Sequence, residues 1–116
     1  MSEEPSTDAE SLFAVLDDEY ARAILTETNQ QPMSAKSLAE ACEASLPTIY
    51  RRIDLLSDCG LIEEHTAFSD SGRHYGVYEA TLDQIVIDLT EGEFSADVTA
   101  EPADAADRFT DLWEGI

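Results

Sequence analysis

The chain has 116 residues, of which 43% are hydrophobic, and a formal net charge of -20. This length predicts one domain with a modest core, and the apolar content excludes a wholly disordered acidic protein. A charge of this size argues against a polyanionic partner if it is spread evenly over the chain.

Two helices are predicted before residue 32. Residues 1–8 are polar and acidic, and we expect them to form a disordered leader. Thr7 opens a T-x-x-E sequence typical of a capping box, so a first helix is expected to start there. Asp17 and Asp18 interrupt this helix, and a second helix is predicted for residues 19–28.

The next two helices are separated by a short turn. Ser34 is a good N-cap for a helix over residues 35–42, and Ser45 is a good N-cap for the helix after it. Pro47 falls in the first turn of that second helix, where a missing N–H costs little. Gly60 suits the left-handed conformation at a helix end, so we expect the helix to stop there.

The helix that starts after Ser45 has two different faces. Ile49, Ile53 and Leu56 recur at helical spacing and are expected to be buried. At about 100° per residue, the opposite side is then centred on Arg51 and points outward.

Two hairpins and one more helix complete the chain. Residues 61–68 and 73–80 are β-rich runs on either side of a Ser-Asp-Ser-Gly turn, which predicts a wing. Residues 85–89 and 94–98 have period-two apolar patterns, which predict a second hairpin with one apolar face. Pro102 leads into a last helix with a large apolar stripe.

These elements predict an α+β fold, a winged helix-turn-helix over residues 9–80, with an extra hairpin and a C-terminal helix in residues 81–116. The apolar stripes of the first and last helices are larger than so small a domain can bury alone, which predicts a homodimer. The alternative is that both helices only cover the monomer core. The predicted dimer contacts are Leu12, Phe13, Leu16, Phe109, Leu112 and Trp113.

Positive charge is concentrated in one part of the chain. Residues 34–78 hold four basic and seven acidic side chains, a net charge of -3, whereas the rest holds two basic and nineteen acidic ones. Lys36 is the only lysine, and such lysine-poor acidic compositions resemble those of proteins from extreme halophiles, where molar salt screens charge over roughly 3 Å. An ordinary acidic mesophilic protein is the alternative.

The region of residues 17–80 resembles the winged helix-turn-helix of ArsR-like regulators, in the version common in haloarchaea. The resemblance is carried by Lys-Ser-Leu-Ala-Glu at 36–40, by Ser-Leu-Pro-Thr-Ile-Tyr-Arg-Arg-Ile at 45–53, by Gly-Leu-Ile at 60–62 and by Gly-Arg-His-Tyr at 72–75.

The resemblance implies that residues 45–59 form the recognition helix. Its first turn would then hold phosphates, Tyr50 and Arg51 would reach phosphates or base edges, and Arg73 would serve the wing. Arg52 is left open, because its flanking angle equally suits an ion pair with a nearby carboxylate. The predicted DNA-binding residues are Lys36, Ser45, Pro47, Thr48, Tyr50, Arg51, Arg52 and Arg73.

The sequence departs from the family in its turn and in its cysteines, and the second hairpin and the last helix extend beyond the shared core. Glu43 stands where such turns often have glycine, so the turn is expected to be strained or shaped differently. The cysteine-rich motif of the metal-sensing branch is absent, and no metal or other cofactor is predicted. Cys42 and Cys59 suggest reduced, buried thiols, and a redox sensor, which needs an exposed thiol of lowered pKa, is the alternative.

We therefore predict a sequence-specific DNA-binding transcription regulator that acts as a homodimer, with double-stranded DNA and the basal transcription machinery as expected partners. The sequence has no nucleophile and base at a recognisable spacing and no phosphate-binding glycine loop, so an enzyme is not predicted. Apolar runs fall short of the roughly 18 residues that span a bilayer, and the N-terminus is unlike a signal peptide, so a cytoplasmic protein without a membrane partner is expected. The alternative function is a winged-helix adaptor that binds a protein and never contacts DNA.

Overall fold

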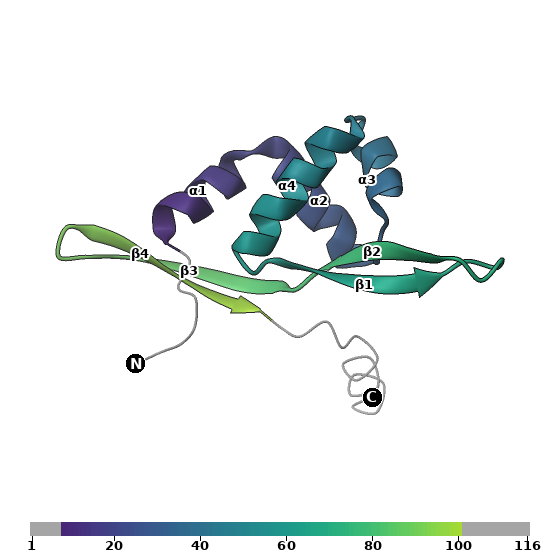
Figure 1. Ribbon diagram of the computed structural model, residues 1–116. Helices are drawn as coiled ribbons and strands as arrows, with labels where there is room; N and C mark the ends of the chain where they lie inside the picture. Colours follow the sequence, from purple (N-terminus) through teal and green to yellow (C-terminus); the bar gives the residue numbers. More distant parts are fainter. Residues whose placement is uncertain (1–7, 101–116) are drawn as a thin grey trace, which may run out of the picture.

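The structure, a computed structural model, describes residues 8–100 and there contains four helices followed by four strands (Figure 1). The elements are α1 (Ala9–Asp17), α2 (Glu19–Gln30), α3 (Ala35–Cys42), α4 (Leu46–Asp58), β1 (Ile62–Phe68), β2 (His74–Ala80), β3 (Leu82–Thr90) and β4 (Glu93–Ala100). The helices lie on one side of two hairpins that extend toward opposite ends of the molecule (Figure 1). This is the predicted α+β winged helix-turn-helix fold with a second hairpin.

Asp18 alone separates α1 from α2. Its backbone N–H donates to the carbonyl of Val15 at 3.1 Å, which closes α1. Its carboxylate then accepts from the N–H groups of Tyr20 at 2.8 Å and Ala21 at 3.0 Å, which caps α2. The predicted interruption is confirmed at Asp18, whereas Asp17 is the last residue of α1.

The ends of these two helices differ from the prediction. Asp8, which we assigned to the leader, caps α1 by accepting from the N–H of Ser11 at 2.9 Å. Thr7, the predicted cap, lies outside the described residues. α2 continues to Gln30, two residues further than predicted, and ends where the N–H of Gln31 donates to the carbonyl of Glu27 at 3.4 Å.

Serine caps and a left-handed residue shape the turn between α3 and α4. The hydroxyl oxygen of Ser34 accepts from the N–H of Ser37 at 3.1 Å, and that of Ser45 accepts from the N–H of Thr48 at 3.3 Å. Both predicted caps are confirmed. Glu43 ends α3 with φ 55° and ψ 47°, a conformation that costs a residue other than glycine roughly 1 kcal/mol. The predicted strain of this turn therefore resides in one residue.

The end of α4 also follows the prediction. The helix is capped by Cys59, and Gly60 follows with φ 73°. The N–H of Leu61 then donates to the carbonyl of Leu56 at 3.0 Å, which leads the chain directly into β1.

The core lies where the helices meet the junction of the two hairpins. The predicted inward residues of α4 are confirmed, since Ile49 and Leu56 have no exposed surface and Ile53 is 4% exposed. None of the helices between residues 8 and 100 is long and apolar enough to cross a membrane. The other buried apolar side chains are Leu12, Val15, Ala21, Ile24, Leu25, Ala35, Leu38, Cys59, Leu61, Ile62 and Tyr78.

Backbone hydrogen bonds join the wing, at β2, to the segment between α2 and α3. β1 pairs antiparallel with β2 from Ile62 opposite Ala80 to Phe68 opposite His74. Met33 exchanges two backbone hydrogen bonds with Tyr78, at 3.0 and 2.8 Å, and so adds a one-residue bridge beside β2. We did not predict this bridge, because a single residue after a proline carries no strand pattern.

The second hairpin has the predicted apolar face. Its cross-strand pairs on that face are Ile85 with Val98, Ile87 with Ala96 and Leu89 with Phe94. α1 contacts this hairpin where the ring of Phe13 meets the ring of Phe94 edge-on, with centroids 5.6 Å apart.

Leu12 requires a correction among the predicted dimer contacts. It has no exposed surface, because α1 turns it into the core of its own domain, so it does not contact a second subunit. Phe13 and Leu16 are only partly buried. Phe109, Leu112 and Trp113, with the whole predicted C-terminal helix, lie outside the described residues.

Candidate nucleic-acid interface

The outward face of α4 has the orientation that the sequence predicts. Because Ile49, Ile53 and Leu56 fix one side of the helix in the core, Arg51 is exposed on the other side, and Pro47 and Asp54 are exposed with it. Tyr50, beside them, is 49% exposed. Within residues 8–100 the Arg51 side chain has no hydrogen bond or ion pair, so its guanidinium is available to a ligand.

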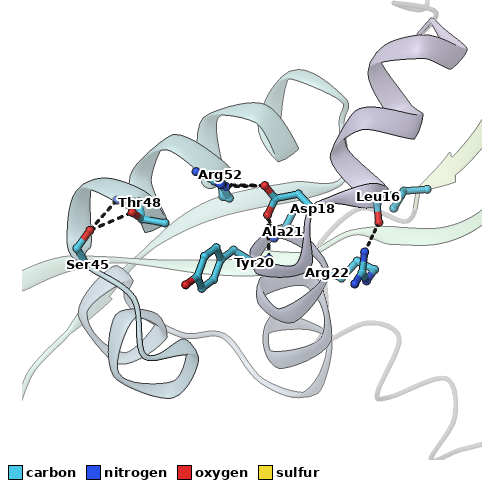
Figure 2. A network of polar contacts seen from close by, with 8 residues as sticks. All are labelled: Leu16, Asp18, Tyr20, Ala21, Arg22, Ser45, Thr48 and Arg52. Atoms are coloured by element: carbon cyan, nitrogen blue, oxygen red, sulfur yellow. Dashed lines mark hydrogen bonds and ion pairs between the residues drawn. The ribbon is translucent and has the colours of Figure 1, made fainter.

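The N-terminus of α4 presents two hydroxyl groups that contact each other. The side chains of Ser45 and Thr48 lie 3.0 Å apart between oxygens, and the Thr48 N–H completes the cap (Figure 2). The first turn of a helix attracts anions because its N–H groups and dipole present positive potential. The structure therefore brings the two predicted phosphate-binding hydroxyls together at a suitable place.

Arg52 does not belong to this outward face. Its Nε and Nη2 both lie 2.9 Å from Oδ2 of Asp18, and its guanidinium carbon is 5.6 Å from the centre of the Tyr20 ring (Figure 2). Both charged side chains are only 24% exposed. The ion pair that the sequence left open is the one observed, and we correct the prediction by removing Arg52 from the DNA-binding set.

This ion pair also favours the ionised form of the carboxylate that caps α2. The hydrogen bond from Arg52 is the main cause that lowers the pKa of Asp18, and the bonds from the backbone of Ala21 and Tyr20 add to it, although burial acts against them. Arg52 thus joins α4 to the start of α2. This role of Asp18 and Tyr20 could not be predicted from the sequence, because both residues are more than 30 positions from Arg52 and only the fold brings them together.

The wing places Arg73 in an exposed loop. Ser69 donates its N–H to the carbonyl of Arg73 at 2.8 Å and accepts from the N–H of Gly72 at 2.9 Å, and Gly72 has φ 85°. These bonds define the turn, while the Arg73 side chain borders a shallow hollow at the wing tip. The hollow is lined by Ser69, Ser71, Arg73, His74 and Tyr75.

The three remaining basic residues of the predicted set come from three elements. Lys36 is exposed in the first turn of α3, Arg51 on α4 and Arg73 in the wing loop. No hydrogen bond or ion pair in the described part of the chain joins them to one another.

Carboxylates are also exposed on α4 and on the wing. Burial raises the pKa of the Tyr78 phenol, and Glu64 raises it further, with smaller effects from Tyr50 and Asp54. Glu64 is the cross-strand partner of Tyr78 in the wing, and Asp54 is exposed on α4. The position of these two carboxylates relative to Tyr78 could not be predicted from the sequence, because they belong to different elements.

The two thiols and His65 have the environments of structural groups. Burial raises the pKa of both Cys42 and Cys59, and a neighbouring carboxylate adds to each effect, so the reactive thiolate is disfavoured. His65 Nε2 lies 3.4 Å from an oxygen of Glu79. Between residues 8 and 100, no group of three or more histidine, cysteine or acidic side chains is placed to hold a metal ion.

Comparison with known proteins agrees with this geometry. Residues 16–65 match a family model described as a helix-turn-helix domain, and together with the β1/β2 wing they form a winged helix-turn-helix. Among solved structures, the chain is similar to an ArsR-like transcriptional regulator from Rhodococcus sp. RHA1, with 34% identity and a TM-score of 0.53. That match covers 61% of this chain and 61% of the regulator. No curated protein matches the chain.

Proposed function

We propose that the protein is a sequence-specific DNA-binding transcription regulator of the ArsR-like, haloarchaeal type, acting as a homodimer at promoters in a high-salt cytoplasm. One observation carries the proposal: α4 is locked into the core on one side and exposes Arg51 and Tyr50 on the other, next to a capped helix N-terminus and a wing. This arrangement suits insertion of α4 into the major groove, with Arg73 on the neighbouring backbone. The helix-turn-helix match and the ArsR-like neighbour support it.

The competing function is an adaptor that uses the same fold to bind a protein, which the net charge of -20 favours. Chromatin immunoprecipitation followed by sequencing separates the two. We expect discrete promoter peaks that share a palindromic motif, because a two-fold dimer reads two half-sites about one helical turn apart. A profile without peaks would support the adaptor.

Salt imposes the strongest constraint on DNA binding by so acidic a chain. With about six phosphate contacts, the logarithm of the binding constant would fall with a slope near -5 against the logarithm of salt concentration, so a change from about 0.15 M to about 3 M would cost on the order of seven decades. Ordinary electrostatic binding would not survive this loss. Exposed carboxylates such as Asp54 on α4 and Glu64 on the wing would offset this loss if they take up cations when DNA binds.

We therefore expect DNA affinity to be nearly independent of KCl concentration, or to rise with it. Fluorescence anisotropy with an operator duplex, titrated from about 0.1 M to about 3 M KCl, measures the slope directly. Replacing Glu64 and Asp54 together by glutamine and asparagine removes the cation-binding groups, and the slope should then become more negative. A steep negative slope of the wild type would contradict the high-salt part of the proposal.

A further inference from the structure

The second hairpin carries more apolar surface than its own domain covers. Ile85, Ala96 and Val98, near the base of the hairpin, pack against the core. Toward the tip, Leu89 is 64% exposed, Phe94 57% and Ile87 44%. We call Ile87, Leu89 and Phe94, with the adjoining Phe13, the hairpin face.

The exposed apolar side chains lie on two strands that pair only with each other. β3 and β4 form a separate two-stranded sheet, and an isolated hairpin is marginally stable in water. Near the tip, the ring contact between Phe13 and Phe94 links it to α1. An apolar patch on so long a hairpin is typical of a surface that another protein covers.

The distribution of charge on the hairpin indicates what covers it. The three exposed apolar residues have no charged residue among their cross-strand pairs, whereas the reverse side of the same hairpin carries Asp88 and Asp97. Two copies of a chain with a net charge of -20 repel each other wherever carboxylates meet, so a second copy requires a neutral contact surface. A basic partner would instead be selected by the acidic reverse side.

We propose that the hairpin face binds a second copy of this chain about a two-fold axis. In such an interface the same patch contributes from both subunits. The β3/β4 tip and the wing lie at opposite ends of the molecule, so this contact leaves α4 and the wing free (Figure 1). The inference deepens the homodimer of the proposed function by naming its surface, and it replaces the buried Leu12 with Leu89 and Phe94.

A matched pair of variants of the full chain tests the surface. Leu89→Glu places a carboxylate in the hairpin face, whereas Val86→Glu places one on the reverse side of the same strand, where Val86 is 42% exposed. Sedimentation equilibrium should give a dimer for the wild type and for Val86→Glu. The dimer dissociation constant of Leu89→Glu should rise by about a hundredfold or more, because an unpaired charge would be buried twice. A monomeric wild type, or equal constants for the two variants, would overturn the proposal.

A measurement on the wild type keeps the proposal testable if Leu89→Glu fails to fold. In a mixture of isotopically labelled and unlabelled chains, the Leu89 methyl groups should show nuclear Overhauser effects to protons of the other copy. Effects confined to the same chain, including residues 101–116, would show that the chain covers its own face and would refute the inference. Because no DNA is present, this outcome is independent of whether the protein binds promoters.

Discussion

Replacing Arg51 by alanine is expected to abolish sequence-specific DNA binding. Arg51 is exposed, has no partner within residues 8–100 and lies on the outward face of α4. A bidentate arginine–guanine contact contributes about 1 to 3 kcal/mol of discrimination, and a dimer loses two such contacts. The dissociation constant for the operator should therefore rise between about 30-fold and about 20,000-fold, measured by fluorescence anisotropy at fixed salt.

Arg22→Ala is the matched control for this loss of charge. Arg22 is also exposed, but it lies on α2 and donates to the backbone carbonyl of Leu16 at 2.7 Å. It should retain operator affinity within about threefold. If Arg51→Ala binds the operator as tightly as the wild type does, Arg51 is not a reading residue. Equal losses in the two variants would indicate a general charge effect.

The largest effect on stability is expected for Asp18→Ala. This substitution removes two capping hydrogen bonds to the start of α2 and leaves the half-buried Arg52 without its carboxylate. Loss of an N-cap costs about 1 kcal/mol, and loss of a partly buried charged hydrogen bond costs about as much or more. We expect the free energy of unfolding to fall by about 2 to 3 kcal/mol and the melting temperature by about 10 °C, measured by circular dichroism.

Asp18→Asn separates the two contributions. Asparagine caps a helix about as well as aspartate does, but it cannot form the ion pair with Arg52. The variant should therefore lose about 1 kcal/mol, less than half of the loss in Asp18→Ala. If the two variants are equally destabilised, the ion pair and not the cap is the main contribution.

Lowering the pH should weaken the stabilising contacts of the Asp18 carboxylate. The pKa of Asp18 is lowered from its ordinary value of 3.8, so the folded state binds this proton less readily than the unfolded state does. The resulting stabilisation is complete above pH 3.8 and is lost as the pH falls through the lowered pKa. Thermal melts in this range should show a weaker acid dependence for Asp18→Asn than for the wild type, and identical profiles would exclude this linkage.

Local hydrogen bonds and periodic patterns explain what could be predicted. Ser34 and Ser45 cap helices through bonds to residues three positions away, and Gly60 ends α4 through its own backbone conformation. The hairpin turns and the alternating face of β3 are equally local. These features depend on neighbours in the sequence, so their positions follow from the residues themselves.

Features that depend on distant residues could not be predicted in the same way. Arg51 and Arg52 are adjacent arginines, and only the packing of α2 beside α4 places Asp18 where it binds the second and leaves the first exposed. The bridge of Met33 to Tyr78 likewise requires β2 to reach the segment before α3.

By itself, the sequence determined the four helices, the wing, the second hairpin and the outward face of α4, because capping, turn geometry and side-chain periodicity act over a few residues. Only the tertiary structure decided that Leu12 belongs to the core while Leu89 and Phe94 face outward, and that the arginine at 52 stabilises the fold. The physical reason is that burial and ion pairing depend on which elements pack against each other. Helical spacing shows which residues share one face of a helix, but it does not show which element covers that face.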